Sequence, residues 1–229
     1  AVHFFQELFL LQPALPFRGR LEVNEQLGHV DGFGIGSILR APGPGGRYPR
    51  PCISEMGGKN PCIVTARADL DAAAAGIARS AYGMSGQKCS ALSRLYVEEG
   101  VADALIERLK GQIAAIKVGD PTRREYWLGP VISAAVCGNY ARYVEELQAG
   151  GARLIAGGRQ LREGALARGF YVEPALIEAP AAHRLWRHEM FEPILMLQRV
   201  RDREEAMRLA NDSDVGLTAG FYGGADEVP

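Results

Sequence analysis

Apolar residues are most regularly spaced near the middle of the chain. Their spacing of four and then three residues puts them on one face of a helix, the stripe being Val101, Leu105, Leu109, Ile113 and Ile116. The segment at 93–97, just before this stripe, is short and mostly apolar, as expected of a buried strand. The pattern therefore predicts a strand followed directly by a helix, an arrangement typical of α/β proteins.

Similar patterns flank this unit on both sides. Helices are predicted from Asp69 or Asp71 to about Tyr82, over a stripe formed by Val136, Tyr140, Val144 and Leu147 that ends at Gly150-Gly151, and from Asp202 to Ala210. Strands are predicted at about 52–54, 61–64, 153–155, 170–177, 194–200 and 218–222. This alternation predicts an α/β fold with an open, mostly parallel sheet and flanking helices.

The first 50 residues are less regular. Glycine and proline are dense between Gly32 and Pro51, as in a loop. The stretch at 32–36 has the spacing GxGxG rather than the GxGxxG of dinucleotide-binding loops, so it is a weak candidate for phosphate binding. We expect residues 1–50 to be an irregular linker and residues 51–229 to be the main domain.

Composition excludes several functional classes. The net charge of the 229 residues is −1, so nothing favours nucleic acid or an anionic membrane as a partner. The apolar opening at 4–15 contains polar residues and lacks a basic flank, so it is a poor signal peptide or membrane span. The cysteines form no CxxC pair, which favours a reducing compartment. We therefore expect a cytoplasmic protein.

Two stretches carry candidate chemistry. Glu55 stands beside a glycine pair, where backbone can approach a ligand closely, and Cys89 lies in a short polar loop after a helical segment. Together they suggest a base and a nucleophile. Either alone would be weak, because a lone Cys is more often a small buried residue and a lone Glu is usually solvated.

The combination resembles the aldehyde dehydrogenase superfamily. Residues 55–61, with sequence EMGGKNP, are similar to its glutamate signature, and residues 86–89, GQKC, to its cysteine signature. A later stretch, EMFEP at 189–193, resembles the Glu-x-Phe-Gly-Pro element, with Glu192 where many members have Gly. The resemblance implies a catalytic pair, Cys89 and Glu55, and NAD as the cofactor, with NADP not excluded.

The same resemblance supplies the cofactor-binding candidates. Glu189 and Phe191 would hold the nicotinamide ribose and ring. Gly19 lies in a segment at 17–23 that is similar to one touching the cofactor pyrophosphate, and Gly57 belongs to the glutamate signature. These assignments are inherited from the family, since Glu189 alone would be read as a surface acid and Phe191 as a core aromatic.

Within the superfamily, the chain looks like the pyrroline-5-carboxylate (glutamate semialdehyde) dehydrogenase branch. The stretches concerned are GQKCSA at 86–91, VGDPT at 118–122 and the segment at 210–220. In that branch the Ser after the cysteine helps to bind the substrate carboxylate, a role implied here for Ser90. The implied substrate is glutamate semialdehyde, and the full-length protein is expected to be a homo-oligomer.

The chemistry explains these residue types. A thiolate adds readily to an aldehyde and later leaves readily, so Cys89 would form a thiohemiacetal and, after hydride transfer to NAD, a thioester. Glu55 would activate the water that cleaves the thioester. No metal is expected, because the sequence at 188–192 misses the HExxH pattern at its last position, where Glu192 stands.

The chain resembles only part of such an enzyme. Most of the nucleotide-binding half would precede residue 1, residues 1–50 would be its remnant, and the main domain would be truncated at its C-terminal end. We therefore expect the 229 residues alone to bind NAD poorly. The alternative to an active dehydrogenase is a catalytically inactive fragment that at most packs against a partner chain.

Overall fold

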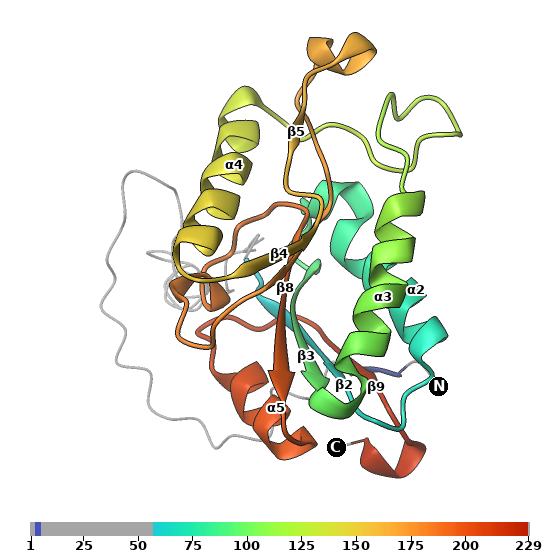
Figure 1. Ribbon diagram of the computed structural model, residues 1–229, viewed down its shortest axis with the longest axis vertical. Helices are drawn as coiled ribbons and strands as arrows, with labels where there is room; N and C mark the ends of the chain where they lie inside the picture. Colours follow the sequence, from blue (N-terminus) through green and yellow to red (C-terminus); the bar gives the residue numbers. More distant parts are fainter. Residues whose placement is uncertain (1–2, 6–56, 229) are drawn as a thin grey trace, which may run out of the picture. The chain divides into compact units, whose positions relative to one another are not determined.

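The computed structural model describes residues 3–5 and 57–228, and most of the described chain surrounds one central sheet (Figure 1). The sheet has the strand order β1-β9-β2-β3-β8-β7-β4. Its strands are β1 (His3–Phe5), β2 (Asn60–Val64), β3 (Leu92–Glu98), β4 (Arg153–Ala156), β7 (Ala175–Glu178), β8 (Ile194–Val200) and β9 (Ala219–Tyr222). A separate hairpin joins β5 (Gln160–Leu161) to β6 (Tyr171–Val172).

The sheet is parallel at its centre and antiparallel at both edges. β9, β2, β3, β8 and β7 pair in parallel, whereas β1 is antiparallel to β9 and β4 is antiparallel to β7. Parallel strands need a crossover segment between them, and helices fill this role here. The open, mostly parallel sheet predicted from the sequence is confirmed.

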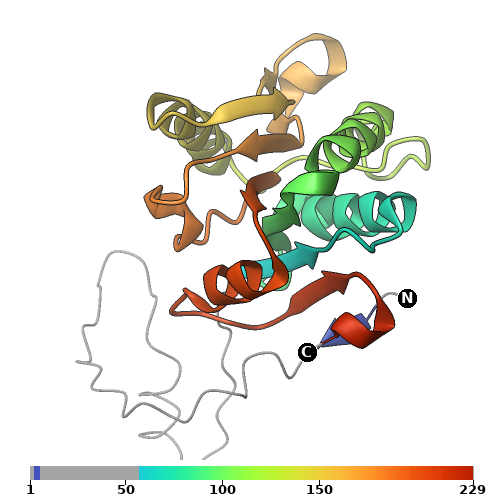
Figure 2. The same ribbon diagram turned by 60° about the horizontal axis from the view of Figure 1, so that its bottom comes forward.

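Helices cover both faces of the sheet (Figure 2). α2 (Leu70–Tyr82) and α3 (Glu99–Ala115) pack on one face, and α4 (Ala134–Ala149) and α5 (Arg203–Asn211) on the other. Alternation along β3 shows why: Leu95 and Val97 join the core under α2 and α3, while Tyr96 joins the core under α4 and α5. The central strands β2, β3, β7 and β8 are thus buried on both sides, as is usual in parallel sheets.

Local sequence signals set the helix starts. Asp69 caps α2, its carboxylate accepting from the backbone N–H groups of Asp71 and Ala72. Ser133 caps α4 and Asp202 caps α5 in the same way. These side chains satisfy amide groups that have no partner within the helix, so the observed helices begin within a residue or two of the predicted positions.

One predicted strand was wrong. Residues 170–177 form two strands, β6 in the hairpin and β7 in the central sheet, rather than one. Between them, the Glu173 N–H donates to the Arg159 carbonyl, and Pro174 has no N–H with which to continue a ladder. The apolar pattern runs through the break because both short strands are partly or fully buried.

Several sequence predictions fall outside the described residues. They are the strand at 52–54, the glycine-rich loop at 32–36 and the site candidates Gly19 and Glu55. The division at residue 50 stays a prediction.

Candidate functional site

The candidate site lies at one end of the central strands. β9, β2, β3 and β8 are consecutive in the sheet and parallel, so the segments that lead into them meet at a single edge. These segments contain Thr218, Gly58-Lys59, Cys89-Ser90-Ala91 and Glu189 to Glu192. The sheet thereby brings the predicted Cys89 and Glu189 segments to the same edge, although they are far apart in sequence.

A left-handed turn leads from α2 towards Cys89. Met84, Ser85 and Gly86 have φ values of 55°, 57° and 68°, a conformation that is rare for residues with side chains. Gly86 is needed here because a Cβ would lie 2.3 Å from the Glu192 carbonyl oxygen. The Ser85 hydroxyl donates to the Gly129 carbonyl (2.9 Å) and so ties the turn to the rest of the domain.

Cys89 is the most accessible of the cysteines that the structure describes. It is partly exposed, whereas Cys62 is 2% exposed and Cys137 is 9% exposed. Burial raises the pKa of both Cys62 and Cys137, so their reactive thiolate form is disfavoured. The contrast in access favours Cys89 as the nucleophile.

Gly58 makes the closest approach to the cysteine loop. A Cβ added to Gly58 would lie 2.1 Å from the Cys89 carbonyl oxygen, so no other residue fits without a shift of backbone. The Gly58 N–H also donates to Glu189 Oε1 (3.0 Å). Gly58 therefore contacts both the Cys89 loop and the Glu189 carboxylate. The cofactor-binding role predicted from the sequence for its neighbour Gly57 stays a prediction.

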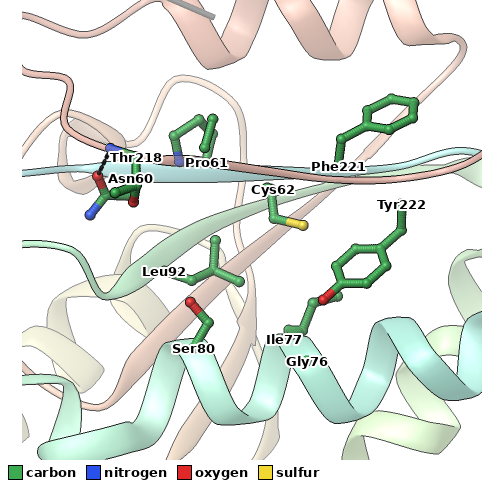
Figure 3. A pocket seen from close by; sticks show the side chains of 12 residues that line it. Asn60, Pro61, Cys62, Gly76, Ile77, Ser80, Leu92, Thr218, Phe221 and Tyr222 are labelled. Atoms are coloured by element: carbon green, nitrogen blue, oxygen red, sulfur yellow. Dashed lines mark hydrogen bonds between the residues drawn. The ribbon is translucent and has the colours of Figure 1, made fainter. Parts of the chain in front are cut away.

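Asn60 extends this connection with its side chain. Its Nδ2 donates to the carbonyl oxygens of Cys89 (2.8 Å) and Ala91 (2.9 Å), and its Oδ1 accepts from the Thr218 N–H (2.9 Å). Figure 3 shows the bond to Thr218. The Thr218 hydroxyl in turn donates to the Ser90 carbonyl (3.4 Å). Ser90, the candidate for the substrate carboxylate, is thus part of a loop held from two neighbouring segments.

Glu189 and Phe191 have the properties that a nicotinamide site needs. One carboxylate oxygen of Glu189 is fixed by Gly58, and Phe191 is 45% exposed with a φ of 58°. An exposed aromatic side chain on such a backbone is uncommon and is often found at functional sites. The two residues present a carboxylate for a ribose hydroxyl and an apolar ring for a flat heterocycle, so they fit the cofactor.

A buried lysine, Lys59, lies near Glu189, and a buried arginine lies behind it. Arg94 is fully buried, and its guanidinium donates to the carbonyl oxygens of Lys59 (2.8 Å) and Ala210 (2.9 Å). Burial, with a smaller effect of the Arg94 charge, lowers the pKa of Lys59 to about 7, while the Glu189 charge acts in the opposite direction. The Lys59 amine has no hydrogen-bond partner in the described part of the chain.

Glu192 is the least expected residue of the site. Its side chain is only 5% exposed, and Oε2 has no hydrogen-bond partner among the described residues. Burial raises its pKa to about 8. One small cavity is lined by residues that include Gly58, Gly86, Glu189 and Glu192. The Glu192 carboxyl group therefore lies within the candidate site rather than on the outer surface.

A second cavity adjoins Asn60 but carries different chemistry. It has a volume of about 30 Å³ and lies between α2 and the strands β2 and β9 (Figure 3). Its lining is mostly apolar and includes the Cys62 thiol, whose pKa burial raises. Neither Cys89 nor Glu189 lines it, so we do not assign the reaction to this cavity.

Sequence reasoning missed Gly58, Asn60 and Thr218 as site residues. Gly58 and Asn60 lie inside the glutamate signature, so proximity to the motif was a usable signal. The sequence carried no such signal for Thr218, because its place beside Asn60 follows from the order of β9 and β2 in the sheet.

The arrangement can be compared with known proteins. Residues 39–227 match the aldehyde dehydrogenase family. This chain belongs to that family. The match covers most of the sequence, including the described residues at the amino ends of β2, β3, β8 and β9.

Two relatives of this aldehyde dehydrogenase family member are named as a semialdehyde dehydrogenase and a pyrroline-5-carboxylate dehydrogenase. The chain is 37% identical over 169 residues to the α-ketoglutaric semialdehyde dehydrogenase of Bacillus subtilis, covering 73% of this chain and 35% of the relative. It is 36% identical over 176 residues to 1-pyrroline-5-carboxylate dehydrogenase 2 of Halalkalibacterium halodurans, covering 76% and 33%. The chain thus spans about a third of the length of these relatives.

A solved structure supports the same placement. The 1-pyrroline-5-carboxylate dehydrogenase from Thermus, with bound NAD, superposes with a TM-score of 0.73 at 36% identity, over 84% of this chain and 36% of that one. The fold of this aldehyde dehydrogenase family member is therefore shared with an NAD-bound relative. No helix among residues 57–228 is long and apolar enough to cross a membrane.

Proposed function

We propose that this chain carries the aldehyde-binding part of an NAD-dependent dehydrogenase that oxidises glutamate semialdehyde to the carboxylate. The observation that carries the proposal is the partly exposed Cys89 thiol in a loop whose carbonyl groups are held by Asn60, next to Gly58, which also binds Glu189. This geometry supports a nucleophile, Cys89, and a carboxylate for the cofactor, Glu189, that are both held by residues 58–60.

The residues have separate tasks in this proposal. The Cys89 thiolate adds to the aldehyde carbon, and the carbonyl oxygen becomes the hydroxyl of a thiohemiacetal. When that carbon gives up its hydride, the hydroxyl loses its proton to solvent and the carbonyl forms again, which leaves a thioester. Glu55 then takes a proton from the water that cleaves the thioester, which releases the carboxylic acid and the free thiol.

Glu189 and Phe191 are the residues that would hold the nicotinamide end of NAD or NADP, and Gly19 and Gly57 are the further residues proposed to bind the cofactor. When bound, the cofactor accepts the hydride. Support comes from the Gly58 contact that fixes Glu189 and from the exposed ring of Phe191. A fixed carboxylate and ring would orient the nicotinamide, which matters because hydride transfer needs close alignment.

The names of the relatives narrow the substrate class. Glutamate semialdehyde and α-ketoglutaric semialdehyde are both five-carbon acids with an aldehyde at the far end from a carboxylate. We propose that Ser90 helps to bind this carboxylate. Other copies of the full-length chain are the proposed protein partners, in the cytoplasm.

Aldehyde capture can be tested on the 229-residue protein itself. Limiting iodoacetamide at neutral pH, read by peptide mass spectrometry, should label Cys89 several-fold faster than Cys62 and Cys137. Millimolar glutamate semialdehyde should slow the labelling of Cys89 alone, whereas glutamate, which has no aldehyde, should not. Urea should erase the difference between the cysteines.

Ser90→Ala provides the matched control for the substrate. It should weaken protection by glutamate semialdehyde and by α-ketoglutaric semialdehyde, but leave protection by propanal, which lacks a carboxylate, unchanged. Labelling of Cys89 that is unaffected by any aldehyde would contradict the proposed function.

A further inference from the structure

The carbonyl groups around Cys89 are held in an unusual way. The oxygens of Cys89, Ser90 and Ala91 each accept a hydrogen bond from a side chain on a neighbouring segment, two from Asn60 and one from Thr218. The Ala91 N–H also donates to the Lys88 carbonyl (3.0 Å). Since the peptide unit is planar, fixing each carbonyl fixes the direction of the following N–H as well.

Asn60 is suited to this task by burial and by chemistry. It is 1% exposed, and the amide supplies donors for two carbonyl groups and an acceptor for the Thr218 N–H. A residue without the amide would leave buried carbonyl groups unpaired, which is costly. Figure 3 shows the Asn60 amide turned towards Thr218 at the start of β9.

Asn60 also sits one residue beyond Lys59 and two beyond Gly58, whose N–H binds Glu189. Residues 58–60 therefore contact the Cys89 loop, the residue that precedes β9 and the carboxylate of Glu189. A rigid strand, β2, begins at Asn60 itself, so this frame is anchored in the core of the sheet.

We propose that Asn60 is a positioning residue that sets the main-chain path of the Cys89 loop relative to Glu189. It acts through the loop backbone and does not itself touch substrate. A role of this positioning in catalysis rests on the proposed function. The positioning itself can be measured without any aldehyde or cofactor.

The direct test is hydrogen exchange, measured by mass spectrometry, on the purified protein. In Asn60→Ala, the peptide covering 84–92 should exchange at least ten-fold faster, while peptides from α2 and α3 stay unchanged. Thr218→Val, which removes only the bond to the Ser90 carbonyl, should produce a smaller increase in the same peptide. Asn139→Ala is the matched control, because Asn139 is a partly exposed residue of α4 whose side chain bonds Arg142, far from the Cys89 loop in sequence.

A second readout follows the thiol. The rate of Cys89 alkylation across pH 6 to 9 should rise several-fold in Asn60→Ala as the loop is released, and protection by glutamate semialdehyde should weaken. Labelling of Cys62 and Cys137 in the same sample reports on unfolding. If this labelling shows that Asn60→Ala is unfolded, hydrogen exchange of the peptide 84–92 in Thr218→Val tests the proposal instead.

Unchanged exchange at 84–92 in a folded Asn60→Ala protein would overturn the proposal. An equal increase in α2 and α3 would also do so, because it would mean that Asn60 supports the whole fold and not the loop. Failure of the proposed function is distinguishable: the exchange and alkylation changes would remain, but no aldehyde would protect Cys89 even in the unsubstituted protein.

Discussion

The two ends of the parallel strands use polar groups in opposite ways. At the carboxyl ends, charges are paired at or near the surface: Arg67 with Asp226, and Arg199 with exposed Asp103 and partly buried Glu178. At the amino ends, the groups are buried and mostly uncharged partners hold them, as with Asn60 and the carbonyl groups of Cys89 and Ala91. Exposed ion pairs tolerate changes, whereas buried networks leave unpaired groups when one member is lost.

The comparison shows which end of the strands is more sensitive to single substitutions. Exposed ion pairs at the carboxyl end, such as Arg67 with Asp226, are screened by salt and contribute little each. The site end depends on single contacts that no neighbour can replace, such as Gly58 against Cys89. We therefore expect substitutions of similar size to have very different effects at the two ends.

The largest effect is expected for Gly58→Ala. The added Cβ would collide with the Cys89 carbonyl oxygen at 2.1 Å, so the loop or β2 must shift, at a cost of about 3 kcal/mol in the free energy of unfolding. Urea denaturation measures this cost.

Gly111→Ala is the control for that substitution. Gly111 lies within α3 with open space around a Cβ, so alanine there should stabilise the protein by about 0.5–1 kcal/mol. An equal cost at both positions would show that the amino end is not specially constrained.

Glu192→Gln should have the next largest effect, and its sign should depend on pH. The pKa of Glu192 is raised to about 8 in the folded protein, so the folded state holds the proton more tightly than the unfolded state does. Stability therefore falls as pH rises from about 4.5 to 8. Glutamine removes this loss, which reaches about 1.4 kcal/mol per pH unit within that range.

Denaturation of both proteins at pH 5, 7 and 9 tests this expectation. Glu192→Gln should be no more stable than the unsubstituted protein at pH 5, and more stable by about 2 kcal/mol at pH 9 once the unpaired amide is allowed for. The nearest titratable groups on α4 are Cys137 and Tyr140, whose pKa values are raised mainly by burial and in smaller part by Glu192. A stability difference independent of pH would contradict the buried-carboxyl interpretation.

The smallest effect is expected at the carboxyl end. Arg67→Ala removes an exposed pair with Asp226, and we expect no resolvable change in the midpoint of thermal unfolding at physiological salt. Differential scanning calorimetry in low and high salt is the measurement. A clear loss of stability would place this end in the same class as the site end.

Sequence patterns predicted the helices well because their signals are local. Asp69 and Asp202 cap their helices at the expected places, Ser133 caps α4 just before its predicted stripe, and the apolar stripes face the two cores. Motifs led to Cys89 and Glu189, whose segments the sheet brings to the same end of the strands, and the roles of both residues stay predictions. The place of Thr218 beside Asn60 depends on strand order, which no local pattern encodes. The break at Pro174 was hidden by apolar residues on both sides.

The strand order also affects how the protein is made. Glu189 follows Gly58 by 131 residues, and Thr218 follows Asn60 by 158. At typical synthesis rates, roughly 8 to 30 s separate the emergence of Asn60 from that of Thr218. During this interval the nucleophile loop exists on the ribosome without the partner that completes its frame. The hydrogen bonds around the Cys89 loop are thus completed late, only when β9 joins the sheet beside β2.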